Sequence, residues 1–404
     1  MKVIISTPEP KDGVARYAAE LAAAVAQAGI ETVLFCPANF EFTKLAQAGG
    51  ATIAFGPERD VCAAGLVWRI VRNVIFLARA AAVQLRIVGR GDVLHFQNPL
   101  HFPLGFVFYA LARMKGGSIV LTAHDPLPHQ WRLPGVLVRV ERTMLGWAYR
   151  LADAVVVHNV AGERILTGAF GIRPERVRII PHGPDSTAGA ISSFPDSAAL
   201  RLLAFGAIRR NKGLLSAIAA VQSLRGKLAI PVTLTICGQP NTAAEVSYWA
   251  ECQRLIASAP EGIEVQLGFV PEAEVPALLA RHHALVLPYD DFHSESGVAA
   301  LALSHRRPVL ATGAGGLGEL LAAFDCGLLI AAPTQSAVED AIRAAADAGH
   351  GELEQMGLRG ERGLHTARSW ESIGQRTTEF YRDLPALKRG SWAADVLTPR
   401  GQDN

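Results

Sequence analysis

Short hydrophobic runs alternate along the chain with longer amphipathic segments. The first run, at 3–7, is followed by a segment over 14–27 in which Tyr17, Leu21 and Val25 recur at helical spacing. Gly29 follows that segment, as is typical of a helix end. Further runs that predict strands lie at 32–36, 93–96, 119–122, 155–158 and 177–181. This alternation predicts βαβ units and a parallel sheet.

A second series of the same kind follows a loose segment, 184–199, that is rich in Ser, Gly, Pro and Ala. Its predicted strands lie at 202–205, 232–237, 264–268, 284–288, 308–312 and 327–332. The pattern predicts two α/β domains, and ligands of such sheets bind at the carboxyl ends of the strands.

These series define the predicted domain boundaries. We place the first domain at 1–186, a linker at 187–199 and the second domain at 200–365. A helix over 366–384 is expected to pack back on the first domain, and 385–404 is expected to form a flexible tail.

Composition narrows the function classes. The chain has 404 residues, of which 50% are hydrophobic, and a formal net charge of +2. Such a chain suits two buried cores and is not expected to bind nucleic acid. Five scattered cysteines without a C-x-x-C pair argue against disulfides or a zinc site and favour the cytoplasm. Arginines interrupt the longest apolar segment, 65–88, so no transmembrane helix is expected, and the N-terminus does not resemble a signal peptide.

The segment 205–213, FGAIRRNKG, carries the most specific chemistry. It predicts a strand end, a glycine turn, three cations within four residues and a helix that begins at Gly213. Glycines let the backbone approach a ligand, and cations beside a helix N-terminus favour a doubly charged anion. The alternative is a solvated basic turn.

A second segment, PYDDFHSESGV at 288–298, leads into a predicted helix over 299–304. Ser296 and Gly297 at the helix start can direct free N–H groups at a phosphate. Glu295 and His293 offer polar groups for sugar hydroxyls. The alternative is an ordinary serine N-cap.

In this order the two segments resemble the C-terminal domain of family 4 glycosyltransferases. The resemblance spans about 1–383 and continues in RPVLAT at 307–312, GGLGE at 315–319, DGVARY at 12–17, LTAHD at 121–125 and IPHG at 180–183. It implies the GT-B fold, with two Rossmann-like domains facing a central cleft. It also implies retaining transfer of a sugar from a UDP- or GDP-sugar to a glycan, polyprenyl-linked or small acceptor, in bacterial polysaccharide or glycolipid assembly.

The resemblance also implies roles for individual residues. Arg209 and Lys212 would hold the donor diphosphate, and His124 would face the donor sugar. Glu295 is expected to be catalytic with these three. The other expected donor-side residues are Gly13, Gly206, Gly238, His293, Ser296, Gly297, Val298 and Glu319, and the acceptor-side residues are Arg16, Asn98 and Asp125.

The chain departs from the family pattern at two glutamates that many members carry around the glycine loop. Counting back from Pro308, these positions fall at Leu301, or at Ala302 with a slip of one residue, and at His293 or Ser294. Glu295 is the candidate substitute for the first, and nothing replaces the second. We therefore expect diphosphate binding to follow the family, while the sugar and ribose contacts differ.

No metal or other cofactor is expected, because GT-B enzymes act without a metal and the sequence has no D-x-D motif. Asp290 and Asp291 lack that spacing and are expected on a loop. The segment GAGGLG at 313–318 fits a dinucleotide fingerprint but does not follow a domain's first strand, so NAD is not expected. Two alternatives stay open: a GT-B nucleotide-sugar epimerase and a non-catalytic GT-B binding subunit.

A basic stripe is predicted on one helix. No acidic residue occurs from 61 to 91, and the arginines that cluster on one helical face there are Arg69, Arg72, Arg79, Arg86 and Arg90. One hypothesis is peripheral docking on the anionic inner face of the cell membrane, and the alternative is a solvated surface helix.

Overall fold

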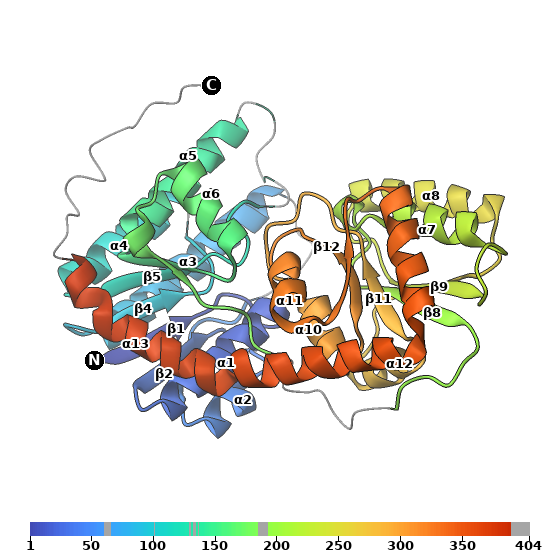
Figure 1. Ribbon diagram of the computed structural model, residues 1–404. Coiled ribbons are helices and arrows are strands. Elements are labelled where there is room, and N and C mark those ends of the chain that lie inside the picture. Colours follow the sequence, from blue (N-terminus) through green and yellow to red (C-terminus); the bar gives the residue numbers. More distant parts are fainter. Residues whose placement is uncertain are drawn as a thin grey trace. The chain divides into compact units, whose positions relative to one another are not determined.

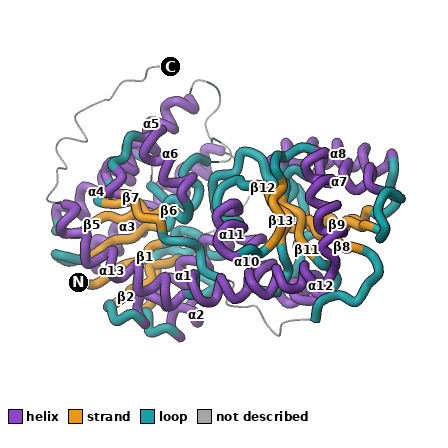
Figure 2. Tube along the Cα trace, viewed as in Figure 1, coloured by secondary structure: helices purple, strands orange, loops and turns teal. Residues whose placement is uncertain are grey.

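The computed structural model describes residues 1–59, 66–100, 102–128, 131, 135, 137–184 and 193–388; side chains are not described at 66–70, 272 and 385–388. The chain divides into two compact units. Unit 1 comprises Met1–Pro181 together with the residues from Trp370 onward, and unit 2 comprises His182–Ser369. Each contains one sheet with helices on it, as Figures 1 and 2 show, which confirms the predicted α/β class.

Unit 1 is built on a seven-stranded parallel sheet with the order β3-β2-β1-β4-β5-β6-β7. Its strands are β1 (Lys2–Ser6), β2 (Glu31–Cys36), β3 (Thr52–Phe55), β4 (Val93–Phe96), β5 (Ser118–Thr122), β6 (Ala154–Val157) and β7 (Val177–Ile179). The sequence pattern did not predict β3, because this edge strand has no fully buried residue and so lacks a clear hydrophobic run.

The helices of unit 1 cover both faces of that sheet. They are α1 (Gly13–Gln27), α2 (Thr43–Ala48), α3 (Leu66–Ile87), α4 (Pro103–Met114), α5 (Leu137–Leu151), α6 (Val160–Phe170), the 3-10 turn η1 (Pro174–Arg176) and α13 (Trp370–Lys388). Successive strand residues alternate between two cores: Val3 and Ile5 pack with α1, α2 and α13, whereas Ile4 packs with the helices α3 to α6.

Unit 2 repeats this plan with a six-stranded sheet in the order β10-β9-β8-β11-β12-β13. Its strands are β8 (Leu200–Phe205), β9 (Val232–Gly238), β10 (Ile263–Leu267), β11 (Ala284–Leu287), β12 (Val309–Thr312) and β13 (Gly327–Ile330). Its helices are η2 (Arg210–Lys212), α7 (Leu214–Leu224), α8 (Ala243–Ser258), η3 (Glu272–Glu274), α9 (Val275–Ala280), α10 (Gly297–Ser304), α11 (Leu317–Phe324) and α12 (Gln335–Ala367).

The boundaries differ in detail from those expected. Unit 1 ends at Pro181 rather than at 186, and 185–192 of the expected linker lie outside the described residues. The last helix begins at Trp370 and belongs to unit 1, where Gly374 lets α13 approach the Ala24 carbonyl of α1 so closely that a Cβ would clash. Residues 385–388, expected in the tail, continue α13, while 389–404 lie outside the described part of the chain.

Each sheet has one point where the strand order reverses, between β1 and β4 in unit 1 and between β8 and β11 in unit 2. The connections from these strands leave to opposite sides and open a crevice at the carboxyl ends, where open α/β sheets bind ligands. We call these two places the unit 1 switch point and the unit 2 switch point.

Candidate functional site

The unit 2 switch point begins with a glycine turn after β8. Gly206 has a φ of 105° and donates its N–H to the Cys237 carbonyl at 2.9 Å. Gly238, with a φ of 152°, passes so close to the Gly206 carbonyl that a side chain would clash with it. Both predicted glycines are therefore needed for the strand ends to meet here.

The three cations of the following turn have different partners. Arg209 Nε donates to Glu245 Oε1 at 3.0 Å, and Arg210 pairs with Glu251 at 2.5 Å. Lys212 makes no ion pair with any residue that the structure describes; its Nζ lies 3.8 Å from the ring centroid of Tyr289. A hollow at the ends of β8, β9 and β11 is lined by Lys212 together with Gly206 and Tyr289. Lys212 thus brings an uncompensated charge to the hollow.

Two helices begin beside this hollow. Gly213, with a φ of 66°, caps α7 without a side chain, and a Cβ there would clash with the Pro288 carbonyl. Ser296 caps α10 by accepting the Ala299 N–H at 3.2 Å, and a side chain at Gly206 would come within van der Waals contact of Val298. Helix N-termini carry partial positive charge, so α7, α10 and Lys212 together suit an anion.

The acidic candidates of unit 2 differ from the cations in their burial and in their partners. Glu295 is buried and pairs with Arg368 at 3.2 Å; burial raises its pKa to about 7, although Arg368 opposes the shift. His293 contacts the exposed Asp291 at 3.0 Å, and Glu319 is half-buried in the first turn of α11. Sugar contacts by His293 and Glu295 stay predictions, and the burial of Glu295 favours a role in holding the loop.

In unit 1, the loop after β1 leads into α1 through a strained residue. Asp12 has a φ of 121° and a ψ of −178°, a conformation that favours glycine, and its carboxylate accepts the Ala15 N–H at 2.9 Å. Burial is the main cause that raises the pKa of Asp12. Gly13 begins the helix with open space where a Cβ would lie, and Arg16 Nε lies 3.9 Å from Glu20.

His124, at the end of β5, belongs to a hydrogen-bonded chain. His158 Nδ1 donates to the Ile180 carbonyl at 2.8 Å, so Nε2 of a neutral His158 accepts from His124 Nδ1 at 3.0 Å. The remaining His124 nitrogen, Nε2, lies 3.4 Å from the Gln97 amide, whose Nε2 has no partner among the described residues. Rotating that amide by half a turn lets Gln97 donate to His124, which fixes the tautomer.

The other unit 1 candidates also follow strands of the sheet. Asn98 is half-buried after β4, and Asp125 is exposed next to His124. Tyr17 of α1 packs its ring edge against His124 and His158, with centroids at 4.8 and 5.2 Å. The described part of the chain has no group of three or more residues placed to hold a metal, and no helix in it could cross a membrane.

Sequence reasoning missed several residues that hold the candidates in place. Glu245 fixes Arg209 and also completes the capping box of α8 with Thr242; the T-x-x-E spacing could have revealed it. Arg368, the partner of Glu295, lies 73 positions away, and no local pattern marks it. Two arginines of the predicted basic stripe, Arg79 and Arg86, are exposed on α3. The side chain of Arg69 lies outside the described residues.

Two family descriptions match the chain. "Glycosyltransferase Family 4" matches residues 11–187, and "Glycosyl transferases group 1" matches residues 199–347. Together they cover most of both units.

Curated relatives match the chain at low sequence identity. The chain is 25% identical over 307 residues to a glycogen synthase of Mycobacterium tuberculosis, covering 74% of this chain and 70% of that protein. It is 26% identical over 341 residues to a D-inositol 3-phosphate glycosyltransferase of Pseudarthrobacter chlorophenolicus, covering 78% and 77%.

Solved structures share the fold over nearly all of the chain. HepE of Anabaena, solved with UDP and glucose, has a TM-score of 0.72 at 15% identity, covering 95% of this chain and all of that one. Sucrose-phosphate synthase of Thermosynechococcus elongatus has a TM-score of 0.71 at 17% identity, covering 96% and 99%. With both family matches and this fold, the chain belongs to the family 4-like glycosyltransferases of the GT-B type.

Proposed function

We propose that this glycosyltransferase moves a sugar from a UDP- or GDP-sugar, with retention of the anomeric configuration, to a glycan, lipid-linked or small acceptor. The proposed setting is bacterial polysaccharide or glycolipid assembly in the cytoplasm. The observation that carries the proposal is Lys212, a cation without a carboxylate partner among the described residues, in the hollow of the unit 2 switch point. The UDP complexes of HepE support the nucleotide-sugar class of donor.

Lys212 would act on the leaving group. Breaking the bond between the sugar and the diphosphate leaves negative charge on the diphosphate, and Lys212 with the first amides of α7 and α10 would stabilise it. Arg209 is held by the buried Glu245, so its guanidinium is pre-positioned beside the same turn. Gly206 and Gly238, which have no side chains, would let the donor approach the backbone closely. Gly297 and Val298 would donate their backbone N–H groups to it.

The sugar would meet a different set of residues. His124, in the tautomer fixed by His158, keeps Nε2 as an acceptor, and a sugar hydroxyl would donate to it in place of the Gln97 amide. Glu295 would position the loop before α10 through Arg368, and Glu319 would border the nucleotide. Gly13 would lie near the donor phosphates, while Arg16, Asn98 and Asp125 would face the acceptor.

The first experiment measures donor use directly. UDP-, GDP- and ADP-sugars are screened by thermal shift, where a ligand at about 100 times its Kd stabilises by roughly 2.7 kcal/mol. The donor that binds is then incubated with and without acceptor, and the products are separated. A glycosylated acceptor of unchanged anomeric configuration is expected. A changed sugar still attached to the nucleotide would indicate an epimerase, and binding without any turnover would indicate a binding subunit.

Metal independence is tested in the same assay. We infer that charge stabilisation comes from Lys212 and the helix amides without a metal, so the rate should be the same in EDTA. A loss that Mg²⁺ or Mn²⁺ restores would contradict this part of the proposal.

We also propose that α3 docks the enzyme on an anionic membrane. Arg79 and Arg86 are exposed on α3, and Val74 and Ile75 are 50% and 46% exposed on the same helix. Basic and apolar side chains on one exposed helix suit an interface with acidic lipids. Flotation with liposomes should increase with the fraction of anionic lipid, and equal flotation with neutral liposomes would exclude this mode of binding.

A further inference from the structure

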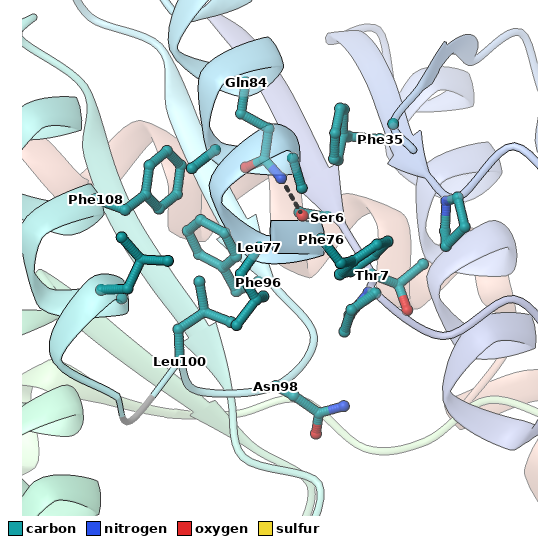
Figure 3. A pocket seen from close by; sticks show the side chains of 17 residues that line it. Ser6, Thr7, Phe35, Phe76, Leu77, Gln84, Phe96, Asn98, Leu100 and Phe108 are labelled. Carbon is teal, nitrogen blue, oxygen red and sulfur yellow. Dashed lines mark hydrogen bonds between the residues drawn. The ribbon is translucent and has the colours of Figure 1, made fainter. Parts of the chain in front are cut away.

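The two sheets differ in how well helices cover their apolar side chains. In unit 1, side chains at the carboxyl ends of β1, β2 and β4 enclose a small pocket together with side chains of α3 and α4, as Figure 3 shows. Phe96 of β4 packs there against Phe108 of α4, with 5.6 Å between the ring centroids. In unit 2, Val265 and Leu267 of the edge strand β10 are 39% and 54% exposed. Strand β10 therefore presents apolar surface to solvent.

Strand β10 also differs from the strands at the other sheet edges, which are β3, β7 and β13. Strands β3 and β13 have four residues each and β7 has three, and short edge strands resist pairing with another chain. Strand β10 has five residues, contains neither lysine nor proline, and exposes every residue except the half-buried Ile263. A longer, exposed edge of this kind is a template for a further strand.

The backbone groups of β10 point alternately towards β9 and away from it. The Gly262 carbonyl accepts the N–H of Leu234 in β9 at 2.8 Å, so the even-numbered residues of this segment face β9. The odd-numbered residues direct their N–H and C=O groups to the free edge; they are Ile263, Val265 and Leu267. The Ile263 N–H donates to the Pro260 carbonyl at 3.2 Å, and the other outward groups have no hydrogen-bond partner in the part of the chain that the structure describes.

We propose that two copies of this chain pair through β10, antiparallel, about a two-fold axis at Val265. Each Val265 N–H would donate to the partner's Val265 carbonyl, and each Leu267 N–H would donate to the partner's Ile263 carbonyl. The two sheets of unit 2 would then form one continuous sheet, and two-fold dimers are the commonest protein oligomers. The interface is independent of the proposed sugar transfer, because it needs neither donor nor acceptor.

The side chains match in the same register. Ile263, Val265 and Leu267 share one face of β10, so the axis would join two apolar rows into one. On the other face, the Glu264 carboxylate would lie opposite the partner's Gln266, whose amide can donate to it. An axis at Glu264 would instead place two carboxylates opposite each other, which is unfavourable. Strand β10 is thus complementary to itself, which favours a second copy of the chain as its partner.

Analytical ultracentrifugation of the whole chain over a range of concentrations tests this pairing. The wild type should approach twice the monomer mass as its concentration rises. Val265→Pro should weaken the dimer roughly thirtyfold, because the axis loses both of its hydrogen bonds. The change leaves the hydrogen bonds to β9 in place, since the Val265 N–H points away from that strand. A wild type that stays monomeric at every concentration would overturn the inference.

Two charge variants test the position of the axis. Val265→Lys and Val265→Glu each place like charges opposite each other, so each variant alone should be mostly monomeric. An equimolar mixture should restore the dimer, because the lysine of one copy then faces the glutamate of the other; mixing would not rescue misfolded variants. The control is Phe55→Lys on edge strand β3, where Phe55 is 53% exposed, and it should dimerise like the wild type. Dimers in either Val265 variant alone, or a mixture that stays monomeric, would show that β10 does not pair in this way.

Discussion

The two switch points share one topology and differ in their chemistry. Both lie where a parallel sheet reverses its strand order. The unit 1 switch point has walls of phenylalanine and leucine, with no charged side chain among the described residues that line it. The unit 2 switch point has glycines and Lys212. The fold therefore sets where a ligand binds, and a few side chains set what it is.

The helices that begin at the two switch points also differ in the charge of their N-terminal caps. In unit 1, the carboxylate of Asp12 accepts an N–H at the start of α1 and so offsets the positive end of that helix. In unit 2, α7 is capped by Gly213, which has no side chain, and Lys212 precedes it. An anion is thus favoured at α7 over α1, which supports the proposed diphosphate site in unit 2.

The largest effect is expected when the unit 2 switch point loses its charge. Lys212→Ala should lower kcat by about 10²–10³-fold, because an electrostatic group aimed at developing charge is worth roughly 3–4 kcal/mol. Steady-state transfer of labelled sugar measures it. Arg210→Ala is the matched control, since Arg210 already pairs with Glu251, and it should change kcat by less than about threefold. Similar losses in both variants would show that the turn binds donor only through its overall charge.

A second prediction concerns the buried ion pair of Glu295 and Arg368. The pKa of Glu295 is raised from 4.5 to about 7, so between these values the folded protein keeps a proton that the unfolded chain has lost. The free energy of unfolding therefore falls as pH rises through this window. Relative to Glu295→Gln, the wild type should lose on the order of 3 kcal/mol between pH 4.5 and 7.5. Denaturant unfolding at several pH values measures this.

The control for that experiment is Glu251→Gln, which removes a carboxylate from the surface pair with Arg210. Its unfolding curve should run parallel to that of the wild type across the same pH range. Parallel curves for Glu295→Gln as well would mean that Glu295 is charged in the folded protein at all these pH values, and that Arg368 outweighs burial.

The sequence predicted the buried strands and the turn with Lys212 better than the contacts around them. Strands such as Val93–Phe96 are buried on both faces and appear as unbroken hydrophobic runs, and the turn with Lys212 is a local pattern. Edge strand β3 has no such run. Partners such as His95 and Tyr381 are 286 positions apart, and only the packing of α13 into unit 1 brings them together. Spacing along the chain carries no signal for such pairs.

That distant pair gives a smaller effect, confined to unit 1. His95 Nδ1 lies 2.5 Å from the Tyr381 hydroxyl and Nε2 lies 2.7 Å from Thr122 Oγ1, and burial lowers the pKa of His95 to about 3. Tyr381→Phe leaves one buried ring nitrogen without a partner, which should cost about 1–3 kcal/mol of unfolding free energy. Nucleotide affinity, which we propose resides in unit 2, should be unchanged.

The matched change in unit 2 is Tyr248→Phe, because the Tyr248 hydroxyl accepts the Leu215 N–H at the start of α7. This variant should weaken nucleotide binding while leaving the stability of unit 1 as it was. Calorimetric titration with UDP or GDP on both variants distinguishes them. If Tyr381→Phe weakened nucleotide binding as strongly as Tyr248→Phe, the proposed diphosphate site at the unit 2 switch point would be wrong.

The smallest effect is expected at Asp12, where strain and capping oppose each other. The backbone there has a φ of 121°, which costs of order 1–3 kcal/mol for a residue with a side chain, and the carboxylate cap returns about 1 kcal/mol. Asp12→Gly removes both the strain and the cap, so its unfolding free energy should lie within about 2 kcal/mol of the wild type. If it is lower than that of the wild type, the difference should not exceed the roughly 1 kcal/mol of the lost cap. Asp12→Ala keeps the strain and loses the cap, so it should be about 1 kcal/mol less stable than wild type. Urea unfolding of the three proteins measures both differences, and an alanine variant as stable as the glycine variant would mean that the loop relaxes and holds no strain in unit 1.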